Sequence, residues 1–593
     1  MIKLKRLNNL TRKYSGLSGG QVIYQKLLEH DVKNVWLSTG GAVMPLVDAF
    51  YKGSIKYYLP THEQSGGHSA AGYAKSTGKP GISIVTSGPG FTNSLTPLTD
   101  AMNDSVPFIL LSGQVPLAAM GTQAFQECPS VAMSTPITKW SYCAENTNDL
   151  PSVMDEAFRV ATSGKPGAVH VDLPKCVLSN ELDKVNNIFP SKDVGKKIIS
   201  NKKICSTIDL INNSKKPLII AGQGCNNSYR KLRKFVERSN IPITTTIHAM
   251  GSFDETHPLS LQFLGMHGNA AANYAVQDAD LIIGLGTRFD DRIIGNLKNF
   301  APKAFEAFNK REGGILHVNI DNNEIKNIVD SHYNYNLDCN DFFDLINDKL
   351  IFKDRKEWID KISLWKNKYE FNYNEHDKKL KTQQVIDQIN TYLLKNKCNN
   401  YFISTGVGNH QMMASQFIKW KYPKSFLTSG SLGTMGVGLP YAIGCQIGNP
   451  NSLVIDIDGD GSFNHSIHEL KSVNDYNLPI KIAIMNDSKL SMVKAWEKLF
   501  YDERYTATDL GKNPNYVELA KSFGIKGIKC DNKNDLSNTI DYFLNYKGPI
   551  LCDFVVEPDL CLPLVAPGSS LDKMILHDNE NVSNFIDPKM PPS

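Results

Sequence analysis

Two acidic residues, Asp460 and Asp487, each follow a short, mostly apolar segment of the chain, 453–457 and 480–485. Apolar runs of this length that end at glycine or a polar residue predict buried parallel strands. Because the carboxyl ends of parallel strands meet at one edge of a sheet, we expect both acids at an edge that binds ligands. Carboxylate oxygens there suit Mg²⁺, which takes one or two carboxylates and completes its coordination shell with phosphate oxygens.

The turn Gly459-Asp460-Gly461-Ser462 adds the features of a phosphate site. Glycine allows the backbone to approach a ligand closely, and a helix is expected from about Ser462 to Asn474. The free N–H groups at the start of such a helix attract an anion. An ordinary acidic loop is the alternative, and the second strand with its own terminal acid counts against it.

A Gly-Asp-Gly followed by Asn-Asn one strand later is similar to the signature of thiamine-diphosphate enzymes, although here Asp487 replaces the second asparagine. Such enzymes need a carboxylate that hydrogen-bonds the aminopyrimidine ring, so that the ring can remove the thiazolium proton. Glu63 fits this requirement, because a helix is expected to begin there. Stabilisation of the helix dipole is the alternative role for an acid at this position.

The composition of the chain indicates a globular enzyme and counts against several other classes of protein. At 593 residues the chain is long enough for roughly three or four domains. Hydrophobic content of 41% and charged content of 21% are typical of a globular enzyme. A net charge of +4 gives no reason to expect nucleic acid, and no apolar run approaches the ~18 residues of a membrane span. The 11 cysteines form no paired motif, which favours a reducing compartment and no structural zinc.

Helix and strand patterns alternate along the chain, and many strands end at glycine turns. This rhythm predicts an α/β fold of three doubly wound parallel-sheet domains, at 16–180, 205–350 and 382–575. A basic segment, 1–15, precedes them and a tail, 576–593, follows them. The basic segment fits either an organelle-targeting peptide or a frayed N-terminus. We expect a cytoplasmic protein, with the mitochondrion or plastid as the alternative.

Short motifs occur in one order over nearly the whole chain, from about Gly16 to Ile575. They are Thr61-His62-Glu63-Gln64, Thr86-Ser87-Gly88-Pro89-Gly90, Phe125-Gln126-Glu127, Asp172-Leu173-Pro174-Lys175, Gly265-Met266-His267-Gly268, Arg288-Phe289-Asp290-Asp291-Arg292, Gly433-Thr434-Met435-Gly436 and Gly459-Asp460-Gly461. A single tetrapeptide is a weak signal, but the ordered set is specific. The set resembles the catalytic subunit of acetohydroxyacid synthase, also called acetolactate synthase.

The resemblance implies a thiamine-diphosphate site built by a pyrimidine-binding first domain and a diphosphate-binding third domain. Glu63 would activate the cofactor, and Met435 would lie beneath its bend. Asp460, Asp487 and the backbone oxygen of Lys489 would hold Mg²⁺. The full set implied to bind thiamine diphosphate is Glu63, Asn409, His410, Gly433, Met435, Gly461 and Ser462.

The resemblance also implies that the central, nucleotide-binding-like domain holds FAD. The flavin would be structural, because condensation of two ketoacids transfers no net electrons. Lys165 and Asn319 depart from the family pattern, which has an arginine and an acid at these positions. The residues implied to contact FAD are Lys165, Met266, His267, Gly268, Gly286, Arg288, Asn319 and Asp338.

The implied reaction is decarboxylation of pyruvate and condensation of the hydroxyethyl unit with pyruvate or 2-ketobutyrate, in branched-chain amino-acid synthesis. Gln126 and Lys175 would join Glu63 and Met435 in catalysis, and Phe125, Arg292 and Trp496 would contact substrate. A homodimer or homotetramer and a regulatory small subunit are implied as partners. Two other hypotheses remain open: a different thiamine-diphosphate lyase or oxidase, and a non-catalytic relative that acts as a binding protein.

Overall fold

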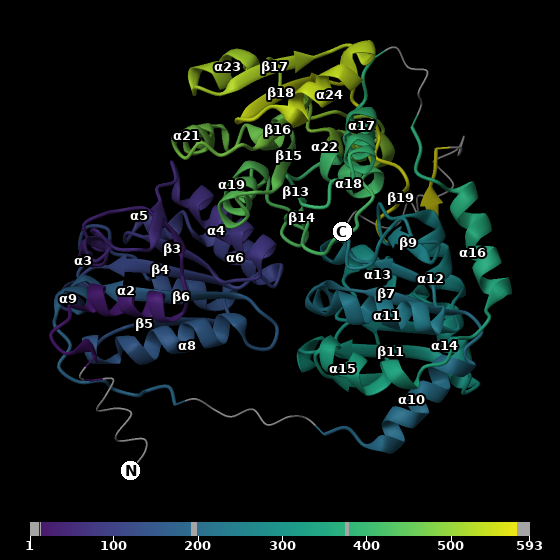
Figure 1. Ribbon diagram of the computed structural model, residues 1–593, viewed down its shortest axis with the longest axis horizontal. Helices are drawn as coiled ribbons and strands as arrows, with labels where there is room; N and C mark the ends of the chain where they lie inside the picture. The colour runs from purple at the N-terminus through teal and green to yellow at the C-terminus, as the bar shows by residue number, and fades with distance from the viewer. Residues whose placement is uncertain (1–10, 12, 191–197, 374–378, 578–593) are drawn as a thin grey trace.

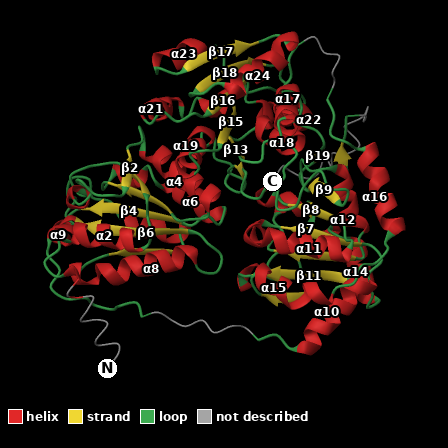
Figure 2. Ribbon diagram, in the orientation of Figure 1, coloured by secondary structure: helices red, strands yellow, loops and turns green. Residues whose placement is uncertain are grey.

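The structure is a computed structural model that describes residues 11, 13–190, 198–373 and 379–577 (Figure 1). Their strands form three six-stranded sheets and one two-stranded sheet. Figure 2 shows the strands of each large sheet layered between helices. Every strand pair within the three large sheets is parallel. This arrangement confirms the predicted α/β class with three doubly wound parallel sheets.

The first unit has the strand order β2-β1-β3-β4-β6-β5. Its strands are β1 (Asn34–Leu37), β2 (Lys56–Tyr58), β3 (Gly81–Val85), β4 (Phe108–Gln114), β5 (Trp140–Cys143) and β6 (Ala168–Pro174). The helices that cover it include α2 (Gly19–Glu29), α4 (Glu63–Thr77), α6 (Leu95–Asn103), α8 (Leu150–Thr162) and α9 (Lys175–Ser179).

The middle unit has the order β12-β11-β10-β7-β8-β9. Its strands are β7 (Pro217–Ala221), β8 (Ile243–Thr245), β9 (Ser260–Phe263), β10 (Leu281–Leu285), β11 (Gly314–Asn319) and β12 (Tyr333–Asn336). Its helices include α10 (Asn201–Asn213), α11 (Tyr229–Ser239), α12 (Ala270–Asp278), α14 (Pro302–Asn309) and α15 (Cys339–Ile346), and α16 (Lys356–Lys368) leads to the third unit.

The third unit has the order β14-β13-β15-β16-β18-β17. Its strands are β13 (Tyr401–Thr405), β14 (Phe426–Leu427), β15 (Leu453–Gly459), β16 (Lys481–Asn486), β17 (Lys526–Cys530) and β18 (Ile550–Val555). Its helices include α17 (Thr382–Lys395), α18 (Asn409–Phe417), α19 (Gly438–Gly448), α22 (Ser491–Phe500), α23 (Tyr516–Ser522) and α24 (Leu536–Asn545). The small antiparallel pair β19 (Leu564–Val565) and β20 (Met574–Ile575) closes the described part of the chain.

The first and third units are joined by direct packing of α4 on α19. A Cβ on Gly72 would lie 2.5 Å from the carbonyl oxygen of Tyr441, and one on Gly444 would lie 1.7 Å from that of Ser69. Glycine at both positions therefore permits an approach of the two backbones that a side chain would prevent. One hydrophobic core cluster continues across this contact, because it includes residues of both units.

The helix predicted from Ser462 to about Asn474 is interrupted in the structure. Helix α20 (Asp460–Phe463) ends early, a 3₁₀ turn follows, and α21 (Leu470–Asp475) begins later. The interruption brings the buried side chain of Glu469 to the start of α4, where it accepts hydrogen bonds from the N–H groups of Thr61 and His62, at 2.9 and 3.2 Å. Satisfying those free helix-terminal donors outweighs continuation of the local helix.

Two predicted terminal segments, 1–15 and 576–593, lie almost wholly outside the described residues. Within the described ranges, no helix combines the length and the apolar character that crossing a bilayer requires.

Candidate active site

The edge of the third sheet carries the two acids that the strand pattern predicts to be neighbours. Asp460 directly follows β15 and Asp487 directly follows β16, and these strands pair in parallel with Gly459 opposite Met485. Asp460 Oδ2 accepts hydrogen bonds from the N–H of Ser488 at 2.8 Å and from Asn513 Nδ2 at 2.5 Å. These donors hold the Asp460 carboxylate at the edge of the sheet, beside the carboxylate of Asp487.

Electrostatics at this edge favour a cation. Burial, and then the neighbouring charge of Asp487, raise the pKa of Asp460 to about 7. Burial also raises the pKa of Asp487, although Ser491 donates to one oxygen and the N–H of Lys489 to the other. Among the described residues there is no cluster of three or more His, Cys, Asp or Glu side chains suited to a metal. A donor set of two carboxylates fits Mg²⁺ completed by phosphate oxygens.

A crowded polar cradle lies next to these acids, at the start of α18. His410 Nε2 lies 3.3 Å from Oδ1 of Asp458, which is fully buried at the end of β15. A Cβ on Gly406 would lie 1.9 Å from Asp458 and 2.1 Å from Ser462 Oγ. Both oxygens of Asp458 and His410 Nε2 lack a hydrogen-bond partner among the described residues. Of these atoms, the imidazole nitrogen of His410 is the one that can donate to a phosphate, whereas the Asp458 oxygens can only accept and serve to orient the imidazole.

The segment between β14 and α19 completes this end of the site. Gly433 has a left-handed φ of +73°, and Met435 follows half-buried. A Cβ on Gly461 would lie 3.8 Å from Met435 Cε, and the N–H of Gly436 donates to Ser462 Oγ at 2.9 Å. The structure thus brings Met435, Gly461 and Ser462 together. Asn409 lies beside them on α18, with Nδ2 bonded to the carbonyl of Asp559 at 2.9 Å.

The first unit presents the other predicted residues separately. Glu63 is the first residue of α4, and its Oε2 accepts a hydrogen bond from Asn93 Nδ2 at 3.0 Å. Gln126 adopts a left-handed φ of 64° and packs against Gly88. Lys175 begins α9 with an exposed side chain, and Phe125 is 89% exposed.

A cavity of about 980 Å³ extends among the three units. Glu63, Phe125, Gln126 and Lys175 are absent from its described lining. The predicted flavin residues that line it are Lys165, Met266, His267, Gly286, Arg288, Asn319 and Asp338. Gly268 is not among its described lining residues, because it packs on the backbone of Leu264 and Gly265. Arg292, Trp496 and Gly433 line the same cavity, so the predicted substrate residues of the middle and third units share it.

The lining of this cavity fits a dinucleotide. A Cβ on Gly222, after β7, would lie 2.3 Å from the carbonyl oxygen of Gly286, after β10, so two strand-end turns approach closely there. Such turns let a backbone approach a pyrophosphate. Lys165 and Glu324 form an ion pair at 2.5 Å in the lining, so the cavity wall carries one cationic and one acidic side chain there. The Asn319 amide instead donates to the carbonyl of Thr287 at 2.9 Å.

Three residues near the site were not predicted from the sequence: Asp104, Glu324 and Asp458. Asp458 had a usable signal, because Asp456 and Asp458 interrupt an apolar strand at alternate positions and therefore share one face. Glu324 and Asp104 had no local signal, since each acquires its partners from distant segments of the chain.

The fold and the edge site define the class of thiamine pyrophosphate enzymes, and family models of that class match all three units. The N-terminal TPP binding domain matches residues 17–133, the central domain 204–346 and the C-terminal TPP binding domain 406–554.

Comparison along the whole chain narrows the class. The chain is 41% identical over 598 residues to the "Acetolactate synthase catalytic subunit, mitochondrial" of Saccharomyces cerevisiae, covering 98% of this chain and 86% of that protein. It is 37% identical over 590 residues to the "Acetolactate synthase large subunit" of Cyanidium caldarium, covering 94% and 96%. It is 35% identical over 571 residues to the "Probable acetolactate synthase large subunit" of Methanocaldococcus jannaschii, covering 94% and 95%. The chain belongs to the acetolactate synthase catalytic-subunit family.

Proposed function

We propose that this chain decarboxylates pyruvate and joins the remaining two-carbon unit to a second 2-ketoacid, pyruvate or 2-ketobutyrate. The observation that carries the proposal is the shared cavity, in which Arg292 and Trp496 lie together with Gly433 of the Met435 segment. A guanidinium is a two-pronged donor for the carboxylate that every 2-ketoacid carries. Identity of 41% over 98% of the chain to a protein named acetolactate synthase supports the same activity.

The third unit would hold the diphosphate end of the cofactor. Bound thiamine diphosphate supplies a nucleophilic carbon and an electron sink for decarboxylation. Asp460, Asp487 and the Lys489 backbone oxygen would hold Mg²⁺, and His410 would donate to the diphosphate beside Asn409, Gly433, Gly461 and Ser462. Met435, whose segment packs on Gly461, would contact the cofactor from there.

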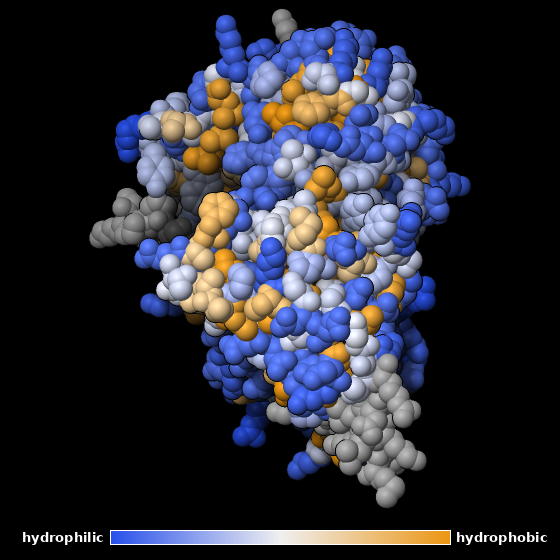
Figure 3. All heavy atoms as spheres, turned by 90° about the vertical axis from the view of Figure 1, so that its left-hand side faces the viewer, coloured by the Kyte–Doolittle hydropathy of each residue, from blue (hydrophilic) through white to orange (hydrophobic). Residues whose placement is uncertain are grey.

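The first unit would act on the cofactor of a second chain. Glu63 would hydrogen-bond the aminopyrimidine ring, and Gln126, Lys175 and Phe125 would complete the substrate side. A homodimer or homotetramer is supported by the apolar side chains that this unit exposes, since Phe125 is 89% and Tyr51 76% exposed. Figure 3 looks onto the left-hand side of Figure 1 and shows apolar groups among polar ones on that face.

The middle unit would hold FAD in the large cavity as a structural group. Lys165, Met266, His267, Gly286, Arg288, Asn319 and Asp338 would contact it directly. Gly268 would act by fixing the turn that carries Met266 and His267, because it packs on that turn's backbone.

Substrate choice would depend on α22. Met492 and Trp496 lie one turn apart on this helix and both line the cavity. One methylene in such a pocket changes discrimination by about 1–3 kcal/mol, so Trp496 would set the preference between pyruvate and 2-ketobutyrate by shape.

Relatives named catalytic subunit and large subunit support a regulatory small subunit as a partner of this chain. The mitochondrial and chloroplastic relatives support an organelle for it as the alternative to the cytoplasm.

The test is product analysis of the purified chain with thiamine diphosphate and Mg²⁺, with and without FAD, on pyruvate alone and in competition with 2-ketobutyrate. We expect acetolactate and acetohydroxybutyrate. Acetaldehyde or acetate instead would assign the chain to a lyase or oxidase, and no product would favour a non-catalytic binding protein.

Glu63→Gln tests the mechanism within this assay. The amide cannot exchange a proton with the ring, so activity should fall by about 10²–10⁴-fold, with thiamine-diphosphate affinity measured by calorimetry largely kept. Unchanged product formation would remove this role of Glu63.

A further inference from the structure

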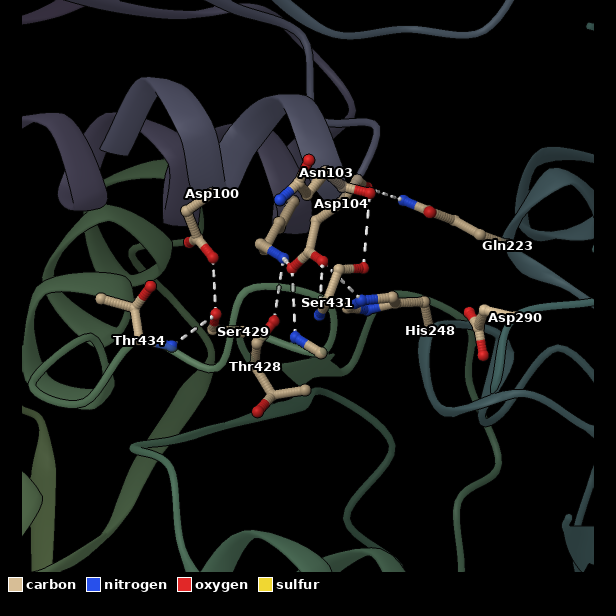
Figure 4. A network of polar contacts seen from close by, with 12 residues as sticks. Asp100, Asn103, Asp104, Gln223, His248, Asp290, Thr428, Ser429, Ser431 and Thr434 are labelled. Atoms are coloured by element: carbon tan, nitrogen blue, oxygen red, sulfur yellow. Dashed lines mark hydrogen bonds and ion pairs between the residues drawn. The ribbon is translucent and has the colours of Figure 1, made fainter. Parts of the chain in front are cut away.

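A buried carboxylate, Asp104, lies where the three units meet. It caps the C-terminus of α6 in the first unit, and its side chain is fully buried. Lys75 Nζ on α4 lies 2.7 Å from Oδ2, and His248 Nε2 of the middle unit lies 3.0 Å from Oδ1. The N–H groups of Gly430 and Ser431 in the third unit donate to the same carboxylate at 3.3 and 3.0 Å (Figure 4).

These contacts determine the charge state of the Asp104 side chain. An acid at a helix C-terminus is opposed by the helix dipole, and burial opposes its ionisation further. The charges of His248 and Lys75 outweigh burial and hold the pKa of Asp104 well below its usual value. A carboxylate in this place is stable only while both cations remain against it.

One side of this contact reaches the segment that carries Gly433 and Met435. Lys75 Nζ donates to the carbonyl of Thr428 at 2.9 Å, while Asp104 accepts the N–H groups of Gly430 and Ser431. Ser429 Oγ then accepts the N–H of Thr434 at 3.0 Å. The segment that carries Gly433 and Met435 is therefore anchored at its first residues.

The other side reaches the lining of the large cavity. His248, Gln223 and Arg288 all line it. Gln223 Nε2 donates to the carbonyl of Asp104 at 2.8 Å. Arg288 donates to the carbonyl of Asn103 and to Ser431 Oγ, each at 2.9 Å. Three cavity side chains thus hold one helix end.

We propose that Asp104 is a positioning residue that couples a dinucleotide in the large cavity to thiamine-diphosphate binding at the Met435 segment. A ligand that orders His248, Gln223 and Arg288 fixes Asp104, and Asp104 fixes the amides of Gly430 and Ser431. By linkage each ligand strengthens the other by the same factor. This inference rests on the two cofactors of the proposed function.

Asp100 provides a matched control one turn earlier on α6. It is equally buried, but its described contacts reach only Ser429, Tyr441 and His68, in the third unit and on α4. Burial and the charge of Asp104 raise the pKa of Asp100, and asparagine keeps the size of this side chain and one of its acceptor oxygens. Asp100→Asn therefore touches the Met435 segment without touching the middle unit.

The experiment titrates FAD into the cofactor-free full chain, with and without thiamine diphosphate and Mg²⁺, by flavin fluorescence. The ratio of the two Kd values is the coupling factor. We expect a factor of at least about five in the unsubstituted protein, about one in Asp104→Asn, and the unsubstituted factor in Asp100→Asn. His248→Leu keeps the Lys75–Asp104 ion pair and should also bring the factor toward one. If Asp104→Asn fails to fold, the His248→Leu variant tests the proposal in its place.

The proposal would be overturned if Asp104→Asn or His248→Leu kept the coupling factor of the unsubstituted protein. A coupling factor of one in the unsubstituted protein would overturn it too, as would an Asp100→Asn factor reduced as much as that of Asp104→Asn. Absence of flavin binding would overturn it together with the flavin part of the proposed function. Coupling without acetolactate formation would contradict the proposed reaction alone.

Discussion

The molecule contains two buried pairs of aspartates that differ in how their charge is balanced. At the helix end, His248 and Lys75 hold the pKa of Asp104 below its usual value despite its burial, while burial and the charge of Asp104 raise the pKa of Asp100. At the sheet edge, burial and the charge of Asp487 likewise raise the pKa of Asp460. There, however, no ion pair of the described residues includes either acid, and the ammonium of Lys489 pairs with Asp509 instead.

The difference separates structural acids from ligand-binding acids of the same type and burial. A buried carboxylate must be paired, protonated or bound to a metal. The helix-end pair contains its own cations and so closes the contact between units. The sheet-edge pair lacks them, and an external cation is the charge that fits. The balance of charge, rather than burial, identifies the site.

The largest effect is expected at the helix end. Asp104→Asn leaves Lys75 and His248 buried without their carboxylate, so the free energy of unfolding should fall by about 3–5 kcal/mol. Chemical denaturation followed by fluorescence measures it, with Asp100→Asn as the control. A loss below about 1 kcal/mol would mean that the helix-end pair is not held by its cations.

The same substitution at the sheet edge should act in the opposite direction. Asp460→Asn removes one of two like charges, so the metal-free protein should be at least as stable as the unsubstituted chain. Its Mg²⁺ affinity should fall by about a hundredfold, because one of two carboxylate ligands is lost. Calorimetric titration of Mg²⁺ with thiamine diphosphate present measures the affinity. If Asp460→Asn instead lowered the free energy of unfolding of the metal-free protein, the sheet-edge pair would behave like the helix-end pair.

The sheet-edge pair also predicts a pH dependence. The pKa of Asp460 is raised from 3.8 to about 7 in the folded chain, so folding favours the protonated acid. Its contribution to stability is complete below pH 3.8 and is lost as pH rises through about 7. In chelator, the stability advantage of Asp460→Asn should therefore grow by about 1.4 kcal/mol per pH unit between pH 3.8 and about 7, and then stay level. Thermal melts across this range measure it, and a constant difference would contradict the shift.

The sequence allowed prediction of what depends on local order. Asp460 and Asp487 follow strands, and Glu63 opens a helix, so pattern and spacing were sufficient to place them. The interruption before α21 was missed because it depends on Glu469 meeting Thr61, far away in the chain. Asp104 was missed for the same reason, since its partners come from residues 75, 248 and 430–431. Contacts between units carry no periodic signal in the sequence.

A third pair, Asp456 and Asp458 on β15, gives the smallest and most closely matched test. Both are fully buried, but only Asp458 lies against His410, at 3.3 Å. Burial and the charge of Asp458 raise the pKa of Asp456, in the same direction as the pKa of Asp100. A carboxylate that orients an imidazole contributes through the ligand the imidazole holds.

Asp458→Asn should therefore weaken thiamine-diphosphate binding by about tenfold, whereas Asp456→Asn should change it by less than about twofold, because the Asp456 side chain accepts from Ser404 and makes no ion pair with His410 among the described residues. Calorimetry at fixed Mg²⁺ compares the two variants directly. Equal losses would mean that burial, not the His410 contact, decides which acids serve the ligand. A loss confined to Asp458 would show that a buried acid can also serve the ligand through the imidazole that it orients.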